Sequence, residues 1–193
     1  MFAPVARFET VRMILALATQ GEWKIYQFDV KFAFLNGDLM EEVYVSQPPG
    51  FEKKIEKNKV LHLRKALYGL KQAPRAWYSK INEFFHDYGF ERSLHEPTLY
   101  VKKQSMNDLL IVSLYVDDMI YTSSSLELIH EFQASMKRMF DMTDLGELQY
   151  FLGLEIVQVR KGIFMSQRKY VVDTLKKIQY AGVQSCSNTN EYR

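Results

Sequence analysis

Apolar residues that recur every three or four positions predict four helices. The first runs from Phe8 to Ala18, and Gly21 supplies its stop. A second is expected to begin near Pro74 and to end at Gly89. Its buried stripe should comprise Trp77, Ile81, Phe84, Phe85 and Tyr88.

The third and fourth helices follow later in the chain. Ser124 and Glu127 have the spacing of a capping box, which predicts a helix through about Phe140. The last helix should carry Tyr170, Val171, Leu175 and Ile178, and the polar tail after Gly182 is expected to be frayed.

Aromatic and β-branched runs predict strands between these helices. The segment WKIYQFDVKFAFL, from Trp23, contains the first strand, and NGDL, from Asn36, is a turn signal. DLLIVSLYV and MIYTS flank Asp117-Asp118 as a hairpin, and LQYFLGLEIVQV with GIFMS suggests another. Helices mixed with antiparallel hairpins indicate the α+β class, with helices packed on one face of the sheet.

Composition limits the class of protein without identifying it. The chain has 193 residues, 47% of them hydrophobic and 25% charged, which is typical of globular material. Its net charge of +2 neither indicates nor excludes a nucleic-acid partner. Cys186 is the only cysteine, which excludes an intramolecular disulfide, and no apolar run is long enough to span a bilayer. We therefore expect an intracellular protein without a membrane partner.

Three aspartates are the candidate catalytic residues. Taken singly, Asp29 at a strand end caps a turn, and Asp117-Asp118 at a hairpin tip is a turn sequence. Together they lie on strongly apolar strands that would be neighbours in one sheet, so their carboxylates would meet at one edge. Mg²⁺ prefers carboxylate and phosphate oxygens, and two such ions can serve an in-line phosphoryl displacement.

Four long blocks resemble one family. LYVDDMIY resembles the YxDD box of reverse transcriptases, and FDVKFAFLNGDLMEEVYVSQPPGF resembles the first catalytic block of the copia type. LRKALYGLKQAPRAWY and MTDLGELQYFLGLEI are similar to later blocks of that family, in the same order. The chain is thus identified as a member of the reverse transcriptases of Ty1/copia-type LTR retrotransposons, a fragment of a Pol polyprotein.

The resemblance implies a polymerase palm, which is a ferredoxin-like antiparallel sheet with helices on one face, together with partial fingers and the start of a thumb. The implied divisions are palm (1–37), fingers excursion (38–73), palm with the YVDD hairpin (74–148), primer-grip hairpin (149–166), and thumb or connection with a frayed tail (167–193).

It also implies roles for individual residues. Asp29 and Asp117 match the metal-binding aspartates, Asp118 matches the third acidic position, and Val30 would offer its backbone carbonyl to a metal. Phe34 matches the bulky residue that blocks a ribose 2′-hydroxyl, with Ala33 beside it at the nucleotide.

The residues expected to contact the nucleotide can also be interpreted without a nucleotide. Phe34 could instead be a core aromatic that alternates with Phe32 along a strand. Gln72 matches the glutamine that lies against the incoming nucleotide, and its alternative is a loop amide before a helix.

Primer and template contacts rest on the same resemblance. Phe151, Leu152 and Gly153 match the primer grip, although an apolar hairpin could equally be core. A basic cluster near Gln72 favours phosphate contact over a merely solvated surface, and it comprises Lys71, Arg75, Lys65 and Arg64.

The implied activity is RNA-directed DNA polymerisation with two Mg²⁺ ions, for which Mn²⁺ is a substitute. Its partners would be an RNA template, a DNA primer, deoxynucleotides and the rest of the Pol polyprotein, in the cytoplasm within virus-like particles. The alternative is a catalytically incompetent retroelement remnant that folds and binds only nucleic acid or a protein partner.

Three departures from the family bear on competence. The chain begins at MFAPVARFET, so the basic fingers segment upstream is missing from it, as are the RNase H and integrase regions. No residue clearly matches the lysine that other reverse transcriptases place before the primer grip as a proton donor, for which Lys137 and Arg138 are weak candidates. We therefore expect this chain to fold and to polymerise poorly by itself.

Overall fold

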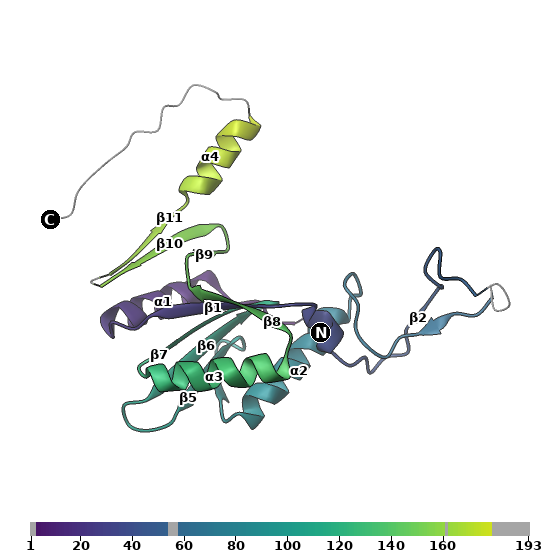
Figure 1. Cartoon of the computed structure of the whole chain (residues 1–193), viewed down its shortest axis with the longest axis horizontal. Coiled ribbons are helices and arrows are strands. Elements are labelled where there is room, and N and C mark those ends of the chain that lie inside the picture. Colours follow the sequence, from purple (N-terminus) through teal and green to yellow (C-terminus); the bar gives the residue numbers. More distant parts are fainter. Residues whose placement is uncertain (1–2, 54–57, 161, 179–193) are drawn as a thin grey trace. The chain divides into compact units, whose positions relative to one another are not determined.

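The computed structural model describes residues 3–53, 58–160 and 162–178. The chain divides into two compact units, residues 1–147 and residues 148–193 (Figure 1). Each unit is described by itself.

The first unit is built on an antiparallel sheet of six strands. Their order is β4-β5-β6-β7-β1-β8, and every neighbouring pair is antiparallel. The strands are β1 (Ile25–Val30), β4 (Glu91–Arg92), β5 (Leu99–Lys103), β6 (Leu109–Tyr115), β7 (Asp118–Ser123) and β8 (Met142–Glu147). With the helices between them, β1-α2-β6-β7-α3-β8 forms a β-α-β-β-α-β unit, which confirms the expected α+β class.

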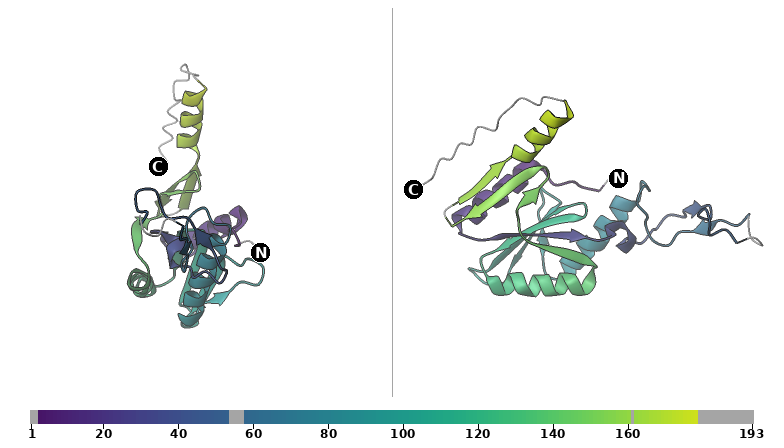
Figure 2. Two further views of the ribbon diagram at one scale, coloured as in Figure 1. Left: turned by 90° about the vertical axis from the view of Figure 1, so that its right-hand side faces the viewer. Right: turned by 45° about the horizontal axis from the view of Figure 1, so that its top comes forward.

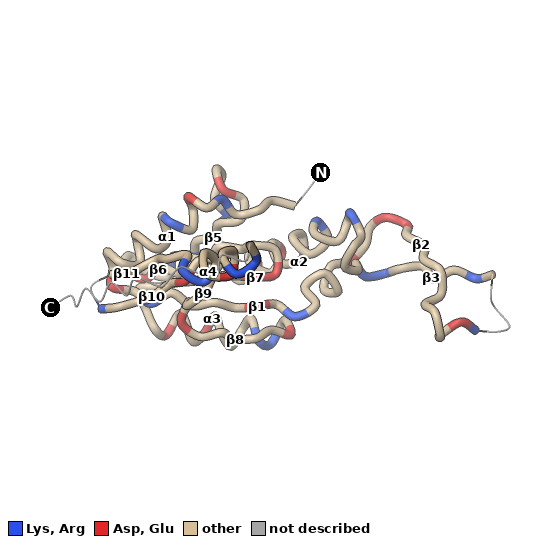
Figure 3. The backbone as a smooth tube through the Cα atoms, turned by 90° about the horizontal axis from the view of Figure 1, so that it is seen from above, with Lys and Arg blue, Asp and Glu red and all other residues tan. Residues whose placement is uncertain are grey.

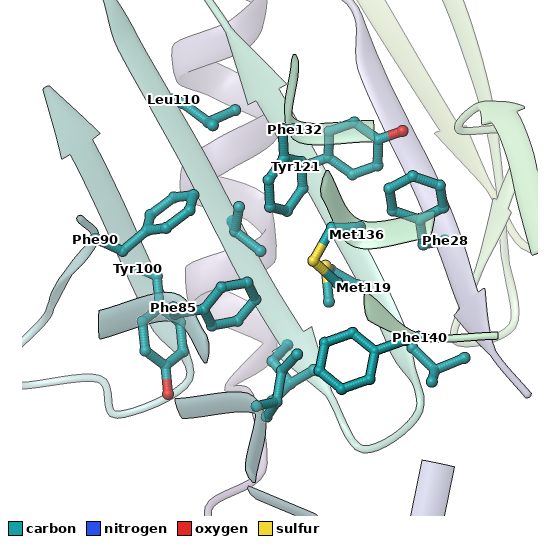
Figure 4. Packing of buried hydrophobic residues seen from close by; sticks show 14 of the residues in the cluster. Phe28, Phe85, Phe90, Tyr100, Leu110, Met119, Tyr121, Phe132, Met136 and Phe140 are labelled. Atoms are coloured by element: carbon teal, nitrogen blue, oxygen red, sulfur yellow. The ribbon is translucent and has the colours of Figure 1, made fainter. Parts of the chain in front are cut away.

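Two helices pack on one face of this sheet, α2 (Ala73–Asp87) and α3 (Leu126–Met139) (Figures 1 and 2). Alternate strand residues point into the same layer, because successive side chains of a strand lie on opposite faces. The layer is rich in aromatic rings, which stack or meet edge to face (Figure 4). Its members include Phe28, Trp77, Phe85, Tyr100, Leu110, Met119, Tyr121, Phe132 and Met136.

The helix α1 (Phe8–Gln20) contacts β7 but contributes nothing to that layer. Its buried side chains include Val11, Ile14 and Ala18. The strand residues Ile25 and Ile120, which alternate along their strands with residues of that layer, are also buried. The expectation of helices on one face therefore holds for α2 and α3, whereas α1 covers the other face. A strand that is apolar on both sides needs a cover on both sides.

The first strand is shorter than its apolar run suggested. Phe32 has φ 49°, and the following residues form the short 3₁₀ helix η1 (Ala33–Asn36). Phe32 and Phe34 therefore do not alternate along a strand. A small excursion follows, in which β2 (Tyr44–Val45) pairs with β3 (Leu61–His62).

The start of α3 also differs by one residue from the expected capping box. Ser125 is the N-cap, and its hydroxyl accepts a hydrogen bond from the backbone N–H of Leu128 at 3.4 Å. Ser124 instead accepts from the N–H of Leu109 and donates to the carbonyl of Asn107, so it closes the neighbouring loop.

The second unit contains a three-stranded antiparallel sheet and one helix. The order is β11-β10-β9, with β9 (Tyr150–Phe151), β10 (Leu154–Val159) and β11 (Gly162–Ser166), followed by α4 (Arg168–Lys177). No residue of α4 is buried. The tail expected after Gly182 lies outside the described residues. Among the helices that are described, none has the length and apolarity to cross a bilayer.

Candidate active site

Two of the three aspartates face each other across neighbouring strands. Asp29 on β1 is the register partner of Asp118, the first residue of β7. Their neighbours Phe28 and Met119 belong to the core under α2 and α3. Because side chains alternate along a strand, both carboxylates lie on the opposite face of the sheet. Cross-strand partners of this kind have Cβ atoms only about 5 Å apart.

Asp117 occupies the two-residue turn between β6 and β7, next to that pair. The backbone N–H of Val30 donates to the carbonyl of Asp117 at 3.0 Å, which ties the turn to β1. The other turn residue, Val116, has φ 58°, an unfavourable conformation for a β-branched side chain. The indole N–H of Trp77 donates to the carbonyl of Val116 at 2.6 Å and so helps to hold this strained turn.

The acidic groups influence one another electrostatically. Burial raises the pKa of Asp118, and repulsion from Asp117 and Asp29 raises it further. The amide of Gln27 donates to Asp118 Oδ1 at 3.1 Å and opposes that shift in the pKa. Crowded carboxylates of this kind favour a bound cation, which would remove their mutual repulsion.

The donor set fits a hard divalent cation by its chemistry, because oxygen ligands from carboxylates suit Mg²⁺ or Mn²⁺. In the part of the chain that the structure describes, however, no three acidic, histidine or cysteine residues are grouped closely enough to hold a metal ion. Asp29, Asp117 and Asp118 are thus neighbours in the sheet, and they do not form a closed cage.

Phe34 and Asp117 line one cavity of about 380 Å³. Apart from Asp117 its lining is apolar or aromatic, and its members are Phe32, Ala33, Phe34, Leu35, Leu67, Tyr68 and Asp117. The Phe34 ring stacks with Tyr68 at a centroid distance of 5.6 Å, and its other contacts reach the core. Phe34 thus contacts the core and also lines this cavity, and its role in blocking a ribose 2′-hydroxyl stays a prediction.

Gln72 lies elsewhere. It is the residue before α2 and lines a different cavity of about 410 Å³, with Arg75 and Lys80 among the other lining residues. The lining of the Phe34 cavity does not include it. Its expected contact with a nucleotide stays a prediction.

The residues of the predicted basic cluster are exposed, but one of them is paired with an acidic side chain. Lys71, Arg75 and Arg64 are exposed, whereas Lys65 forms an ion pair with Asp38, its Nζ 2.6 Å from Oδ1. Both positive and negative residues lie along the excursion and α2 (Figure 3). Any phosphate contact would be made by individual exposed side chains.

The predicted primer grip is a tight hairpin of the second unit. Phe151 pairs with Leu154, and the turn between them consists of Leu152 with φ 50° and Gly153 with φ 82°. Two positive φ values are what a type I′ turn requires, and this turn suits the twist of antiparallel strands. Its role at a primer stays a prediction.

Lys137, a weak candidate for the proton donor, forms an ion pair with Asp144. Its Nζ lies 2.7 Å from Asp144 Oδ2 and 5.9 Å from the centre of the Phe28 ring. It belongs to α3, on the face of the sheet away from Asp29 and Asp118. Arg138, the other candidate, donates to the hydroxyl of Ser135 on its own helix.

Sequence reasoning missed two residues of this region, Gln27 and Tyr68. Gln27 could have been found, because it lies two residues before Asp29 on one strand and hence on the same face. Tyr68 carried only the signal of a Tyr-Gly turn, and its place beside Phe34 depends on chain folding between distant segments.

Comparison with known proteins identifies the family of the chain. The family described as Reverse transcriptase (RNA-dependent DNA polymerase) matches residues 1–190. The chain is 40% identical over 189 residues to the retrovirus-related Pol polyprotein from transposon TNT 1-94 of Nicotiana tabacum, covering 97% of the chain and 14% of that protein. It is 41% identical over 176 residues to the corresponding polyprotein from transposon RE1 of Arabidopsis thaliana, covering 91% and 12%.

A further relative is the putative transposon Ty5-1 protein of Saccharomyces cerevisiae, 37% identical over 144 residues, with coverage of 74% and 46%. No solved structure matches. The chain belongs to the reverse transcriptase family. Within it, the chain is of the Ty1/copia retrotransposon type, and it spans about an eighth of the plant polyproteins it matches.

Proposed function

We propose that this chain carries the palm of an RNA-directed DNA polymerase. The observation that carries the proposal is the Asp29–Asp118 register pair, with Asp117 in the adjoining turn and an aromatic-walled cavity against Asp117. The strand order β6-β7-β1-β8 within a β-α-β-β-α-β unit is the ferredoxin-like arrangement expected of a polymerase palm.

In the proposed reaction, the 3′-hydroxyl oxygen of a primer forms a bond to the α-phosphorus of a deoxynucleoside triphosphate. The bond from that phosphorus to the bridging oxygen breaks, pyrophosphate leaves, and the hydroxyl proton is lost to solvent or a base. Two Mg²⁺ ions, when bound, would neutralise the charge that develops on the attacking and leaving oxygens.

The residues of the chain would divide this work between them. Asp29, Asp117 and the backbone carbonyl of Val30 would hold the metals, with Asp118 as the third acidic group. Phe34 and Ala33 would bound the sugar of the nucleotide, and Gln72 would contact it. Rigid strands support such a site, because the placement of each ligand is then set by backbone pairing.

The proposed nucleic-acid contacts involve exposed basic residues and the predicted primer grip. Lys71 and Arg75 are exposed and would contact phosphates of an RNA template or DNA primer. The hairpin Phe151–Gly153 would hold the primer end. Because the plant relatives are Pol polyproteins, the chain would act as part of such a polyprotein. We propose the cytoplasm, within virus-like particles, as its location.

The test is extension of a DNA primer annealed to an RNA template, with Mg²⁺ or Mn²⁺, by residues 1–193. Because the chain is expected to polymerise poorly by itself, the expected result is weak, template-dependent extension. Asp29→Asn should remove it and Asp87→Asn should retain it, since Asp87 is exposed at the far end of α2. Binding of the primer–template without any extension would overturn the catalytic proposal in favour of the remnant.

A further inference from the structure

The loop before α2 brings Tyr68 to the candidate nucleotide cavity. The backbone N–H of Ala66 donates to the carbonyl of Gly37 at 2.9 Å, and Ala66 is fully buried. The Lys65–Asp38 ion pair joins the same two segments. These ties hold the loop against the end of η1, and so against Phe34.

A turn then presents the Tyr68 ring. The N–H of Leu70 donates to the carbonyl of Leu67 at 3.2 Å, with Tyr68 and Gly69 between them. Gly69 has φ 95°, which a residue with a side chain rarely adopts. The backbone of Tyr68 is therefore defined by its surroundings, yet 91% of the residue is exposed.

An exposed ring held in a defined place is a surface suited to a ligand. The plane of Tyr68 lies 23° from that of Phe34, and both rings line the cavity that ends at Asp117. Its volume of about 380 Å³ is within the range of small-molecule sites. Two aromatic walls and one carboxylate suit a molecule with a planar, weakly polar part and an anionic part joined to the carboxylate through cations.

We propose that Tyr68 is a nucleotide-binding residue, whose ring stacks on the nucleoside part of the incoming deoxynucleoside triphosphate beside Phe34. The proposal rests on the polymerase function proposed above. Because every base has an aromatic face, the contribution should be similar for all four deoxynucleotides. Tyr68 thus contributes affinity, whereas Phe34 contributes discrimination between sugars.

The experiment measures KM and kcat for each deoxynucleotide in RNA-templated extension by residues 1–193. Tyr68→Ala should raise KM by about 5- to 100-fold, the range for loss of one base–aromatic stack, with a smaller change in kcat. Tyr68→Phe keeps the ring and should restore the parental KM. Tyr44→Ala is the matched control, because Tyr44 is also an exposed aromatic in a stacked pair, with His62 at 5.0 Å, in the excursion.

Inorganic triphosphate separates stacking from general damage to the site, because it has neither base nor sugar. Its inhibition constant should be the same for the parent and Tyr68→Ala. An unchanged KM in Tyr68→Ala would overturn the role of Tyr68 and leave the polymerase proposal intact. An equal loss of triphosphate inhibition would also overturn it, since the site itself would then be damaged. A parent chain that neither extends a primer nor is inhibited by triphosphate would overturn both proposals.

Discussion

The indole nitrogen of Trp77 lies 2.6 Å from the carbonyl oxygen of Val116 and donates a hydrogen bond to it. The bond joins α2 to the turn that carries Asp117. Trp77 is almost fully buried, with its ring edge-on to Phe140. A core residue is thereby coupled to the conformation of the candidate metal ligand.

Trp77→Phe should weaken both stability and extension. The unfolding free energy should fall by about 1–3 kcal/mol, because a partly buried carbonyl loses its donor. Extension should fall further than stability explains, since Val116 with φ 58° would relax and move Asp117. Tyr78→Phe is the control, because it too removes a hydrogen bond from α2 to a carbonyl, that of Pro97 at 2.8 Å. It also removes the exposed hydrogen bond that Arg92 donates to the same hydroxyl at 3.2 Å. Equal extension by the two variants at matched folded fractions would contradict the coupling.

Asp117→Asn should abolish Mg²⁺-dependent extension while the chain stays folded. The substitution keeps the shape of the side chain but removes a charged oxygen ligand, and Asp117 is exposed, so little packing depends on it. Primer extension and a thermal melt on the same preparation would check this. Near-parental extension by Asp117→Asn would remove Asp117 from the mechanism.

Phe34→Ala should admit ribonucleotides. With the ring absent, a 2′-hydroxyl would fit into the cavity beside Asp117, and discrimination should fall by about 10- to 200-fold, the usual effect of a small group in a packed pocket. The measurement is the ratio of kcat/KM for a deoxynucleotide and the matching ribonucleotide. Phe51→Ala, at an exposed aromatic outside this cavity, should keep the parental ratio. An unchanged ratio in Phe34→Ala would leave Phe34 as core packing.

Much of this fold could be predicted from local patterns. The helical stripes that include Val11, Trp77 and Ile81 are long enough to define α1 and α2, and the two apolar runs around Asp117 define a hairpin. Register between distant strands was not predictable in detail. The two-residue loop after Tyr115 places Asp117 in the turn and Asp118 at the start of β7. The pairing of Asp118 with Asp29, however, joins strands that are far apart in the sequence.

Other features depended on contacts that no local pattern records. The strand β1 ends at Val30 although apolar residues continue, because Phe32 adopts a positive φ and starts η1. Tyr68 reaches Phe34 only through the ties of its loop to Gly37 and Asp38. Local sequence patterns did not predict such contacts between distant segments, and this part of the site was therefore missed.

Gly37→Ala should destabilise the fold near the candidate nucleotide cavity. A Cβ at this position would lie 2.6 Å from backbone atoms of both Ala76 and Trp77, so η1 and α2 would have to separate. A cost of about 1–3 kcal/mol is typical of such overpacking. Gly162→Ala is a matched control, because its Cβ would meet nothing within 4 Å. Chemical denaturation of the two variants would check the difference, and equal stabilities would contradict the close approach of η1 to α2.

Asp118→Asn should stabilise the chain at neutral pH while removing activity. Burial and the repulsion from Asp117 and Asp29 raise the pKa of Asp118 in the folded state above its value in the unfolded chain. The folded chain therefore binds this proton more tightly, so stability should decrease as pH rises from the ordinary aspartate pKa through the raised one, and then level off. The asparagine variant does not lose stability over this pH window. Its melting temperature should therefore exceed that of the parent most at pH values above the window, and the difference should vanish below it.

Magnesium gives the same prediction a second readout. A cation held by the three carboxylates would bind only the folded chain. At pH values above that window, it would therefore raise the melting temperature of the parent. In Asp118→Asn at the same pH the increase should be smaller, because one ligand charge is gone and less repulsion is left to relieve. Asp87→Asn should behave as the parent, since its exposed carboxylate lies outside the group. If the parent and Asp118→Asn showed the same dependence on pH and on Mg²⁺, the three aspartates would not act as one electrostatic group.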